Sequence, residues 1–228
     1  MSAGLPRPLI CLVTDRRRVR PAGENSLLRL IGGAARAGID LVQIREAALT
    51  DRQLLQLTRG AVAAVSGTAT RILVNDRADV AIAAGAHGVH LRADSVSAGH
   101  VRTLSPPGFT VGRSVHSRAE AIEAARSGVD YLVAGTVYAT PSKPGHTSWL
   151  GISGLSDIVG AVDLPVLAIG GVVADKVWDV AATGAAGVAA IGLFADVRTD
   201  DNDGRVERAL RDLLAGLRAP FRGGPAPG

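Results

Sequence analysis

The chain has 228 residues, of which 47% are hydrophobic but only 3% aromatic, a composition that favours buried parallel strands over an aromatic-rich β-sandwich. The net charge is +4, but the basic residues are scattered outside residues 16–20 and lack interleaved aromatics, which argues against a nucleic-acid partner. The single Cys11 excludes an internal disulfide, and the absence of a membrane-length apolar run or a signal-like start predicts a cytoplasmic protein with no membrane partner.

Eight short apolar runs alternate with segments of helical periodicity along the chain. The helical segments are rich in Ala and Leu and include residues 26–37, 51–65, 118–126 and 174–183. Apolar β-branched runs separated by helices indicate parallel βαβ units. The predicted strands are Leu9–Val13, Leu41–Ile44, Ile72–Val74, Gly88–Leu91, Thr110–Gly112, Tyr131–Ala134, Val166–Ile169 and Gly187–Ile191.

A repeated turn groups these units in pairs. A glycine suited to a left-handed C-cap ends the helix before every second strand, at Gly38, Gly85, Gly128 and Gly184. The repeat predicts a (β/α)8 TIM barrel, an α/β fold with a single domain over residues 1–218. A doubly wound open sheet is the alternative, although no GxGxxG motif opens a helix after the first strand. We expect the Pro/Gly-rich residues 219–228 to form a flexible tail.

Polar residues follow the predicted strands, at the end where a barrel carries its active site. The candidates for catalysis are His90, Ser114 and His116, since histidine is the usual acid/base near neutral pH. Two alternatives stay open: His90 can be a satisfied core histidine, and no acid–His pair marks Ser114 as a nucleophile.

Anion and substrate binding is expected from a second group of residues on the same rim. Arginine binds an anionic group bidentately, hydroxyls and an ammonium suit an anion, and an aspartate binds Mg²⁺ when a second oxygen ligand lies near it. The candidates are Gln43, Arg45, Asn75, Asp76, Thr136, Thr140, Ser142 and Lys143. An ordinary polar loop at 136–143, and a hydrogen bond of Gln43 inside the barrel, are the alternatives.

Glycines after the last two predicted strands predict a phosphate site. Gly170 and Gly171 follow the seventh strand and Gly192 follows the eighth, where backbone N–H groups of a barrel commonly bind phosphate. A purely conformational role in the turns is the alternative. The sequence therefore points to a small phosphorylated molecule as the ligand.

With these residues assembled, the chain resembles the thiamine phosphate synthase/TenI family over nearly its whole length. The matching segments are VTDRR, DLVQIRE, ILVNDRADVAIAAGAHGVHL, VGRSVHSRAEAIEAARSGVDYLVAGTVYATPSK, and LPVLAIGGV through AAGVAAIGLF. The resemblance implies a (β/α)8 barrel in thiamine biosynthesis, a homodimer, and thiazole phosphate in the active site.

The family contains synthases, which join hydroxymethylpyrimidine diphosphate to thiazole phosphate and release pyrophosphate with Mg²⁺. The synthase motifs are matched at Gln43, Arg45, Asn75, Asp76, Ser114, Thr140, Ser142 and Lys143, with Asp76 as a metal ligand in this reading only. The chain departs from them at Ala47, where the motif has Lys, and at Ser95, which aligns with the second metal Asp; Asp94 stands one residue early. These losses remove charge that neutralises a departing pyrophosphate.

TenI-type members are thiazole tautomerases, which move a proton without a metal. The segment Gly112–Ser117 resembles this branch, which shares the losses above. The tautomerase pattern has a His where this chain has Thr136, so His116 or His90 would have to act instead. We favour the tautomerase-type reaction; a Mg²⁺-dependent synthase is the alternative, and a catalytically silent relative that binds thiazole phosphate is the third hypothesis.

Overall fold

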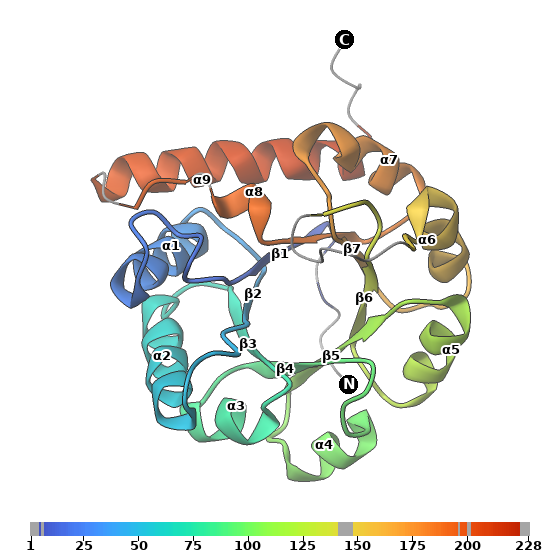
Figure 1. The fold of residues 1–228 in the computed structure, drawn as a ribbon, viewed down its shortest axis with the longest axis horizontal. Helices are drawn as coiled ribbons and strands as arrows, with labels where there is room; N and C mark the ends of the chain where they lie inside the picture. Colours follow the sequence, from blue (N-terminus) through green and yellow to red (C-terminus); the bar gives the residue numbers. More distant parts are fainter. Residues whose placement is uncertain (1–4, 6, 141–147, 196, 200–201, 224–228) are drawn as a thin grey trace.

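The computed structural model describes residues 5, 7–140, 148–195, 197–199 and 202–223. Within them eight parallel strands close into a barrel in which each strand pairs with the next and β8 pairs with β1 (Figure 1). The predicted (β/α)8 TIM-barrel fold is therefore confirmed. The strands are β1 (Leu9–Val13), β2 (Leu41–Ile44), β3 (Arg71–Asn75), β4 (Gly88–Leu91), β5 (Thr110–Val115), β6 (Tyr131–Gly135), β7 (Val166–Ile169) and β8 (Gly187–Ala190).

Helices surround the barrel as an outer ring (Figure 1). The longest, α9, packs against α1, and ion pairs join Arg29 to Asp203 and Arg36 to Glu207. The α-helices are α1 (Glu24–Arg36), α2 (Asp51–Ala64), α3 (Ala78–Ala84), α4 (Ala98–Leu104), α5 (Arg118–Arg126), α6 (Gly151–Val159), α7 (Val177–Ala182), α8 (Gly192–Ala195) and α9 (Asp203–Arg218), with 3₁₀ turns η1 (Ala174–Lys176) and η2 (Ala219–Arg222).

Both faces of the strands are buried, which explains why they read as continuous apolar runs. In β1, Leu9, Cys11 and Val13 point into the barrel, whereas Ile10 and Leu12 join the larger core beneath the helices. Burial raises the pKa of the Cys11 thiol to about 12, so the thiol stays uncharged. The interior side chains of β1 are thus apolar, whereas polar side chains enter the barrel at the carboxyl ends of β2 to β5.

The repeated glycines adopt the predicted backbone conformation. All have a positive φ, with values of 91°, 70°, 86° and 81° at Gly38, Gly85, Gly128 and Gly184. This left-handed conformation reverses the chain directly after a helix and sends it into the next strand.

Several predicted boundaries are wrong. Strands β3, β5 and β6 are longer than predicted and β8 ends at Ala190, while the helix expected over 174–183 is divided into η1 and α7. The predicted tail is also wrong at its start, because residues 219–222 form η2, with Pro220 buried against the fold. Its last five residues, 224–228, lie outside the described part. None of the helices among the described residues is long and apolar enough to cross a membrane.

Candidate active site

Polar side chains from β2 to β5 meet inside the barrel, near the ends of their strands. Gln43 is 4% exposed and donates a hydrogen bond from Nε2 to Asn75 Oδ1 over 2.8 Å. Strand pairing then places Asn75 beside His90 on β4. The structure therefore brings Gln43, Asn75 and His90 together, and the hydrogen bond that sequence analysis allowed for Gln43 inside the barrel is present.

His90 links two further residues of the interior. Its Nδ1 lies 3.0 Å from the hydroxyl of Tyr131, and its Nε2 lies 2.9 Å from Ser114 Oγ. Gly112, between His90 and Tyr131 in the register, makes room for the phenol: a Cβ there would lie 2.2 Å from Tyr131 Cζ. The three side chains form a buried chain that ends at Ser114, which is partly exposed.

The electrostatics of these three side chains do not fit the acid/base role predicted for His90. Its exposed fraction is 2%, and burial lowers its pKa to about 3, so the imidazole is neutral at physiological pH. Burial also raises the pKa of Tyr131 well above its ordinary value, so the phenol keeps its proton. A neutral imidazole with so low a pKa is a poor general base but a good fixed hydrogen-bonding partner for Ser114.

His116 has a different partner. It follows β5, is exposed, and places Nδ1 3.1 Å from Glu120 Oε2, one turn into α5. Its backbone N–H donates to the same carboxylate oxygen over 2.8 Å. The structure therefore joins His90 to Ser114 and ties His116 to Glu120.

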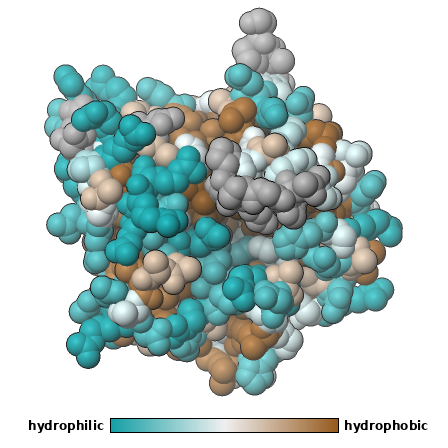
Figure 2. All heavy atoms as spheres, in the orientation of Figure 1, coloured by the Kyte–Doolittle hydropathy of each residue, from teal (hydrophilic) through white to brown (hydrophobic). Residues whose placement is uncertain are grey.

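Arg45 stands at the end of β2 with its side chain exposed. Its backbone N–H donates to Thr14 Oγ1 over 2.9 Å, which ties it to the end of β1. The neighbouring Glu46 is buried, accepts the N–H of Arg16 over 2.9 Å, and has its pKa raised by desolvation. Hydrogen bonds thus fix the backbone around Arg45, and its guanidinium reaches solvent on the rim, where hydrophilic residues gather over the barrel (Figure 2).

Asp76 adopts a positive φ of 62°, and its N–H donates to the carbonyl of His90 over 2.9 Å. Its Oδ1 accepts a short hydrogen bond from Ser95 Oγ, and its Oδ2 lies 3.4 Å from Arg92 Nε. The same Nε lies 3.1 Å from Oδ1 of Asp94. Arg92 therefore lies between the two carboxylates that sequence analysis considered for a metal.

These residues do not fit Mg²⁺. The ion takes oxygen ligands in octahedral geometry, whereas a guanidinium carries only donors and a permanent positive charge. One oxygen of Asp76 faces this cation and the other accepts from Ser95. Within the described ranges, no three His, Cys, Asp or Glu side chains gather as a metal-binding group.

The glycine pair after β7 packs closely against the segment that follows β6. A Cβ on Gly170 would lie 2.2 Å from Thr136 Cγ2, and one on Gly171 would lie 2.4 Å from the carbonyl oxygen of Ala139. Both glycines have positive φ, and Thr136 is buried. Close packing explains these glycines, so their phosphate-binding role stays a prediction. Thr140 is partly buried in the same segment, whereas Ser142 and Lys143 lie outside the described residues.

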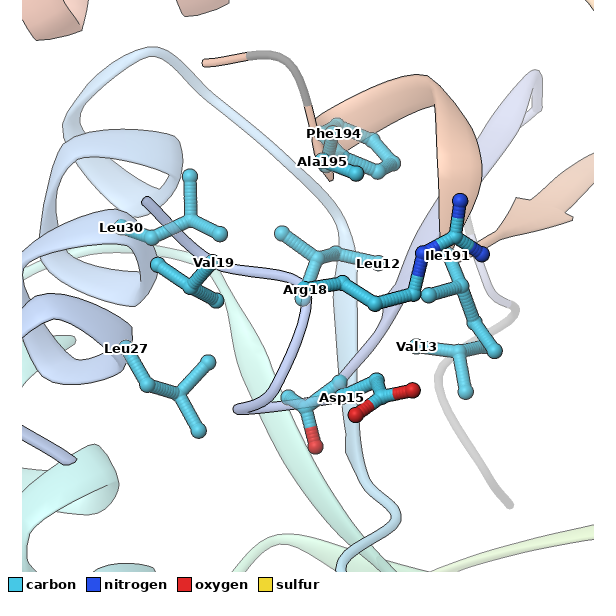
Figure 3. Close-up of a pocket in the computed structure, with 11 residues that line it drawn as sticks. Leu12, Val13, Asp15, Arg18, Val19, Leu27, Leu30, Ile191, Phe194 and Ala195 are labelled. Carbon is cyan, nitrogen blue, oxygen red and sulfur yellow. The ribbon is translucent and has the colours of Figure 1, made fainter. Parts of the chain in front are cut away.

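Gly192, the first residue of α8, has an arginine close to it. A Cβ at this position would lie 3.8 Å from Arg18 Nη2. Arg18 comes from the loop after β1 and extends to Ile191 along a mostly apolar pocket that also contains Asp15 (Figure 3). This cation lies where a phosphate at Gly192 would need one.

Sequence analysis missed several residues of this rim. The sequence indicates Tyr131 only as a residue of a buried strand, and only Gly112 hints at the room its ring requires. Arg18 was visible only as part of the basic residues 16–20. Arg92 lies in none of the matched motifs, and Arg113 lies in the segment Gly112–Ser117 without a role predicted for it; Arg113 donates to the carbonyls of Ala93 and Ser95 over 2.7 and 3.1 Å and so holds the loop after β4.

Comparisons with known proteins agree on one family. The family model described as thiamine monophosphate synthase matches residues 10–194. A thiamine-phosphate synthase of Methanoculleus marisnigri is 40% identical over 211 residues, which cover 92% of this chain and 97% of that protein. A thiamine-phosphate synthase of Roseiflexus castenholzii is 36% identical over 209 residues, which cover 92% of this chain and 89% of that protein.

Solved structures give the same result. A thiamine phosphate pyrophosphorylase from Pyrococcus furiosus is 28% identical with a TM-score of 0.76, covering 94% of this chain and 97% of that chain. A 3-hexulose-6-phosphate synthase, 17% identical with a TM-score of 0.64, shares the fold alone. These relatives support the synthase alternative better than the tautomerase reading favoured from sequence. The chain belongs to the thiamine monophosphate synthase family, within thiamine biosynthesis.

Proposed function

We propose that the chain is a thiamine-phosphate synthase, which joins hydroxymethylpyrimidine diphosphate to thiazole phosphate. The names of its relatives support this activity. The observation that carries it in the structure is the buried chain from Tyr131 through His90 to Ser114, because it positions a hydroxyl on the rim without supplying a titrating base. A synthase needs a positioned hydroxyl, whereas a tautomerase needs a titrating base.

The reaction places simple demands on the protein. The carbon–oxygen bond between the pyrimidine methylene and the diphosphate breaks, and its electron pair leaves with the diphosphate. A carbon–nitrogen bond forms from the thiazole ring nitrogen to the methylene, and the ring becomes cationic. No proton has to be removed by the protein, so its work is to orient the two substrates and to stabilise the departing negative charge.

Hydrogen bonding along the buried chain gives Ser114 a definite role. We assign the phenol O–H of Tyr131 as the donor to His90 Nδ1; in this tautomer Nε2 is the protonated nitrogen and donates to Ser114 Oγ. The hydroxyl proton of Ser114 is then directed away from His90. We assign it to an oxygen of the diphosphate, together with the guanidinium of Arg45.

The remaining predicted residues are assigned to the thiazole phosphate and to the pyrimidine. Gln43 and Asn75, joined over 2.8 Å, are assigned to the pyrimidine diphosphate. Gly170, Gly171, Gly192, Thr136 and Thr140 are assigned to thiazole phosphate, and the nearby Arg18 supports a phosphate at Gly192. Since the residues around Asp76 do not fit Mg²⁺, we assign no step to a metal. The homodimer and the cytoplasmic location remain predictions.

The test is to mix the purified chain with both substrates, with and without Mg²⁺, and to measure thiamine phosphate by chromatography. Product formation is expected, with a large loss in Arg45→Ala. Arg52→Ala, which removes one positive charge from the exposed side of α2, is the matched control and should retain activity. If no product forms while the thiazole carboxylate tautomer is converted, the tautomerase reading replaces this proposal.

A further inference from the structure

The loop after β4 holds a cation where a metal-dependent synthase would hold a metal. Arg92 Nε lies 3.4 Å from Asp76 Oδ2 and 3.1 Å from Asp94 Oδ1, and its Nη2 donates to Asp94 Oδ2 over 3.3 Å. A guanidinium thus joins Asp76 and Asp94. We propose that Arg92 is the fixed cation of this site and that the chain binds the diphosphate group without a divalent metal.

Asp76 is held in position to orient this cation. Its backbone has the left-handed conformation, in which Asp is tolerated better than most residues, and it is anchored to the His90 carbonyl. Its Oδ1 accepts from Ser95, whose Oγ in turn accepts the backbone N–H of Arg92 over 2.9 Å. Ser95 therefore forms a hydrogen bond to the Asp76 carboxylate. An aspartate at position 95 would instead bind a metal together with Asp76.

The loop is also fixed from the other side, so Asp94 is not placed to exchange with Ser95. Arg113 on β5 donates to the carbonyls of Ala93, Ser95 and Val96 over 2.7, 3.1 and 3.2 Å. These bonds hold the backbone on both sides of Asp94, whose side chain is 75% exposed. Of these two carboxylates, Asp76 therefore stands at the position of a metal ligand, and the Arg92 guanidinium lies next to it.

The chemistry of the guanidinium suits the task. It stays protonated at every physiological pH, presents planar N–H donors, and binds phosphate oxygens bidentately. The Arg92 side chain is 57% exposed, so a ligand has access to it. With Arg45 at the end of β2, it supplies the positive charge that a divalent ion and the motif's lysine supply in a metal-dependent synthase, where this chain has Ala47.

This inference rests on the proposed function for its physiological ligand, but its test uses inorganic pyrophosphate and needs no turnover. Binding to the full-length chain is measured calorimetrically in EDTA and again in excess Mg²⁺. We expect binding in EDTA, and a change of less than about threefold with Mg²⁺, because the charge is already provided by arginine. Arg92→Ala should weaken binding in EDTA by at least about tenfold, Arg92→Lys by less, and the remote Arg52→Ala not at all.

A gain-of-function variant makes the test two-sided. Replacing the cation and restoring the carboxylate, in Arg92→Gly combined with Ser95→Asp, should make pyrophosphate binding dependent on Mg²⁺ and create a Mn²⁺ site detectable by electron paramagnetic resonance. Circular dichroism checks that each variant is folded. Pyrophosphate binding by the wild type that disappears in EDTA would overturn the inference, whether or not thiamine phosphate is made. Metal-independent binding without any synthase activity would support the anion site and remove the proposed function instead.

Discussion

His90 Nε2 lies 2.9 Å from Ser114 Oγ, and this contact turns a buried histidine into a support for a hydroxyl on the rim. The other ring nitrogen, 3.0 Å from the Tyr131 hydroxyl, decides which way the hydrogen bonds run.

Tyr131→Phe should lower kcat/KM about tenfold, because His90 loses the donor that fixes its tautomer. The hydroxyl proton of Ser114 then no longer has a fixed orientation. The free energy of unfolding should fall by about 1–3 kcal/mol, since a buried ring nitrogen loses its partner. The informative measurement is a double-mutant cycle with Ser114→Ala, followed in steady-state kinetics. If Tyr131 acts through Ser114, the second substitution adds little to the first; fully additive losses would contradict the role.

The stability of the protein should depend on pH through His90. Its pKa is about 3 when folded and close to 6.5 when unfolded, so between these values the unfolded chain binds the extra proton. This contribution is complete above pH 6.5 and declines as the pH falls, by up to about 1.4 kcal/mol per pH unit. Denaturant unfolding of wild type and His90→Gln at pH 7 and pH 5 measures it.

The wild type should lose more stability than His90→Gln over this interval, because carboxylates and His87 contribute equally to both proteins. The activity profile should meanwhile lack an ionisation of His90 near pH 6. Equal pH slopes for the two proteins would show that His90 is not kept neutral by the fold.

Gly112→Ala should be strongly destabilising and should abolish activity, since the added methyl would lie 2.2 Å from Tyr131 Cζ. Overpacking of this kind costs roughly 1–3 kcal/mol or more, and here it also pushes the phenol away from His90. Gly99→Ala in α4 is the matched control: nothing lies within 4 Å of its Cβ position, and alanine favours a helix. Thermal unfolding should place the two variants on opposite sides of the wild type.

Most of the fold could be predicted because its signals are local. The buried strand Leu9–Val13 and the helix Arg118–Arg126 have the predicted bounds, and a left-handed glycine such as Gly38 ends a helix whatever lies beyond it. Pro220 shows the limit: its Pro/Gly-rich surroundings suggest a flexible tail, but the residue is buried in η2, which packs against α7 and α9. Tertiary contact outweighed local composition there.

The site was harder to predict than the fold, since the roles of its residues depend on contacts across the barrel. The sequence places His90 and Ser114 near the carboxyl ends of neighbouring strands, but it could not show that Tyr131, 41 residues after His90, contacts the second nitrogen of the imidazole. The pairing of Arg92 with Asp76 depends on the unusual backbone of Asp76 and on Arg113 holding the loop. Neither the Asp76 backbone conformation nor the Arg113 contacts correspond to a characteristic residue spacing in the sequence.

The pairing of β1 with β8 sets the order in which this protein can be completed. Leu9 lies opposite Gly187, so β1 has no neighbour on one side until the chain has been synthesised as far as β8. The edge of the nascent sheet must stay unpaired, and open to unwanted association, throughout that interval. Pairing of β8 with β1 removes this edge, so the finished barrel exposes no unpaired strand edge between them.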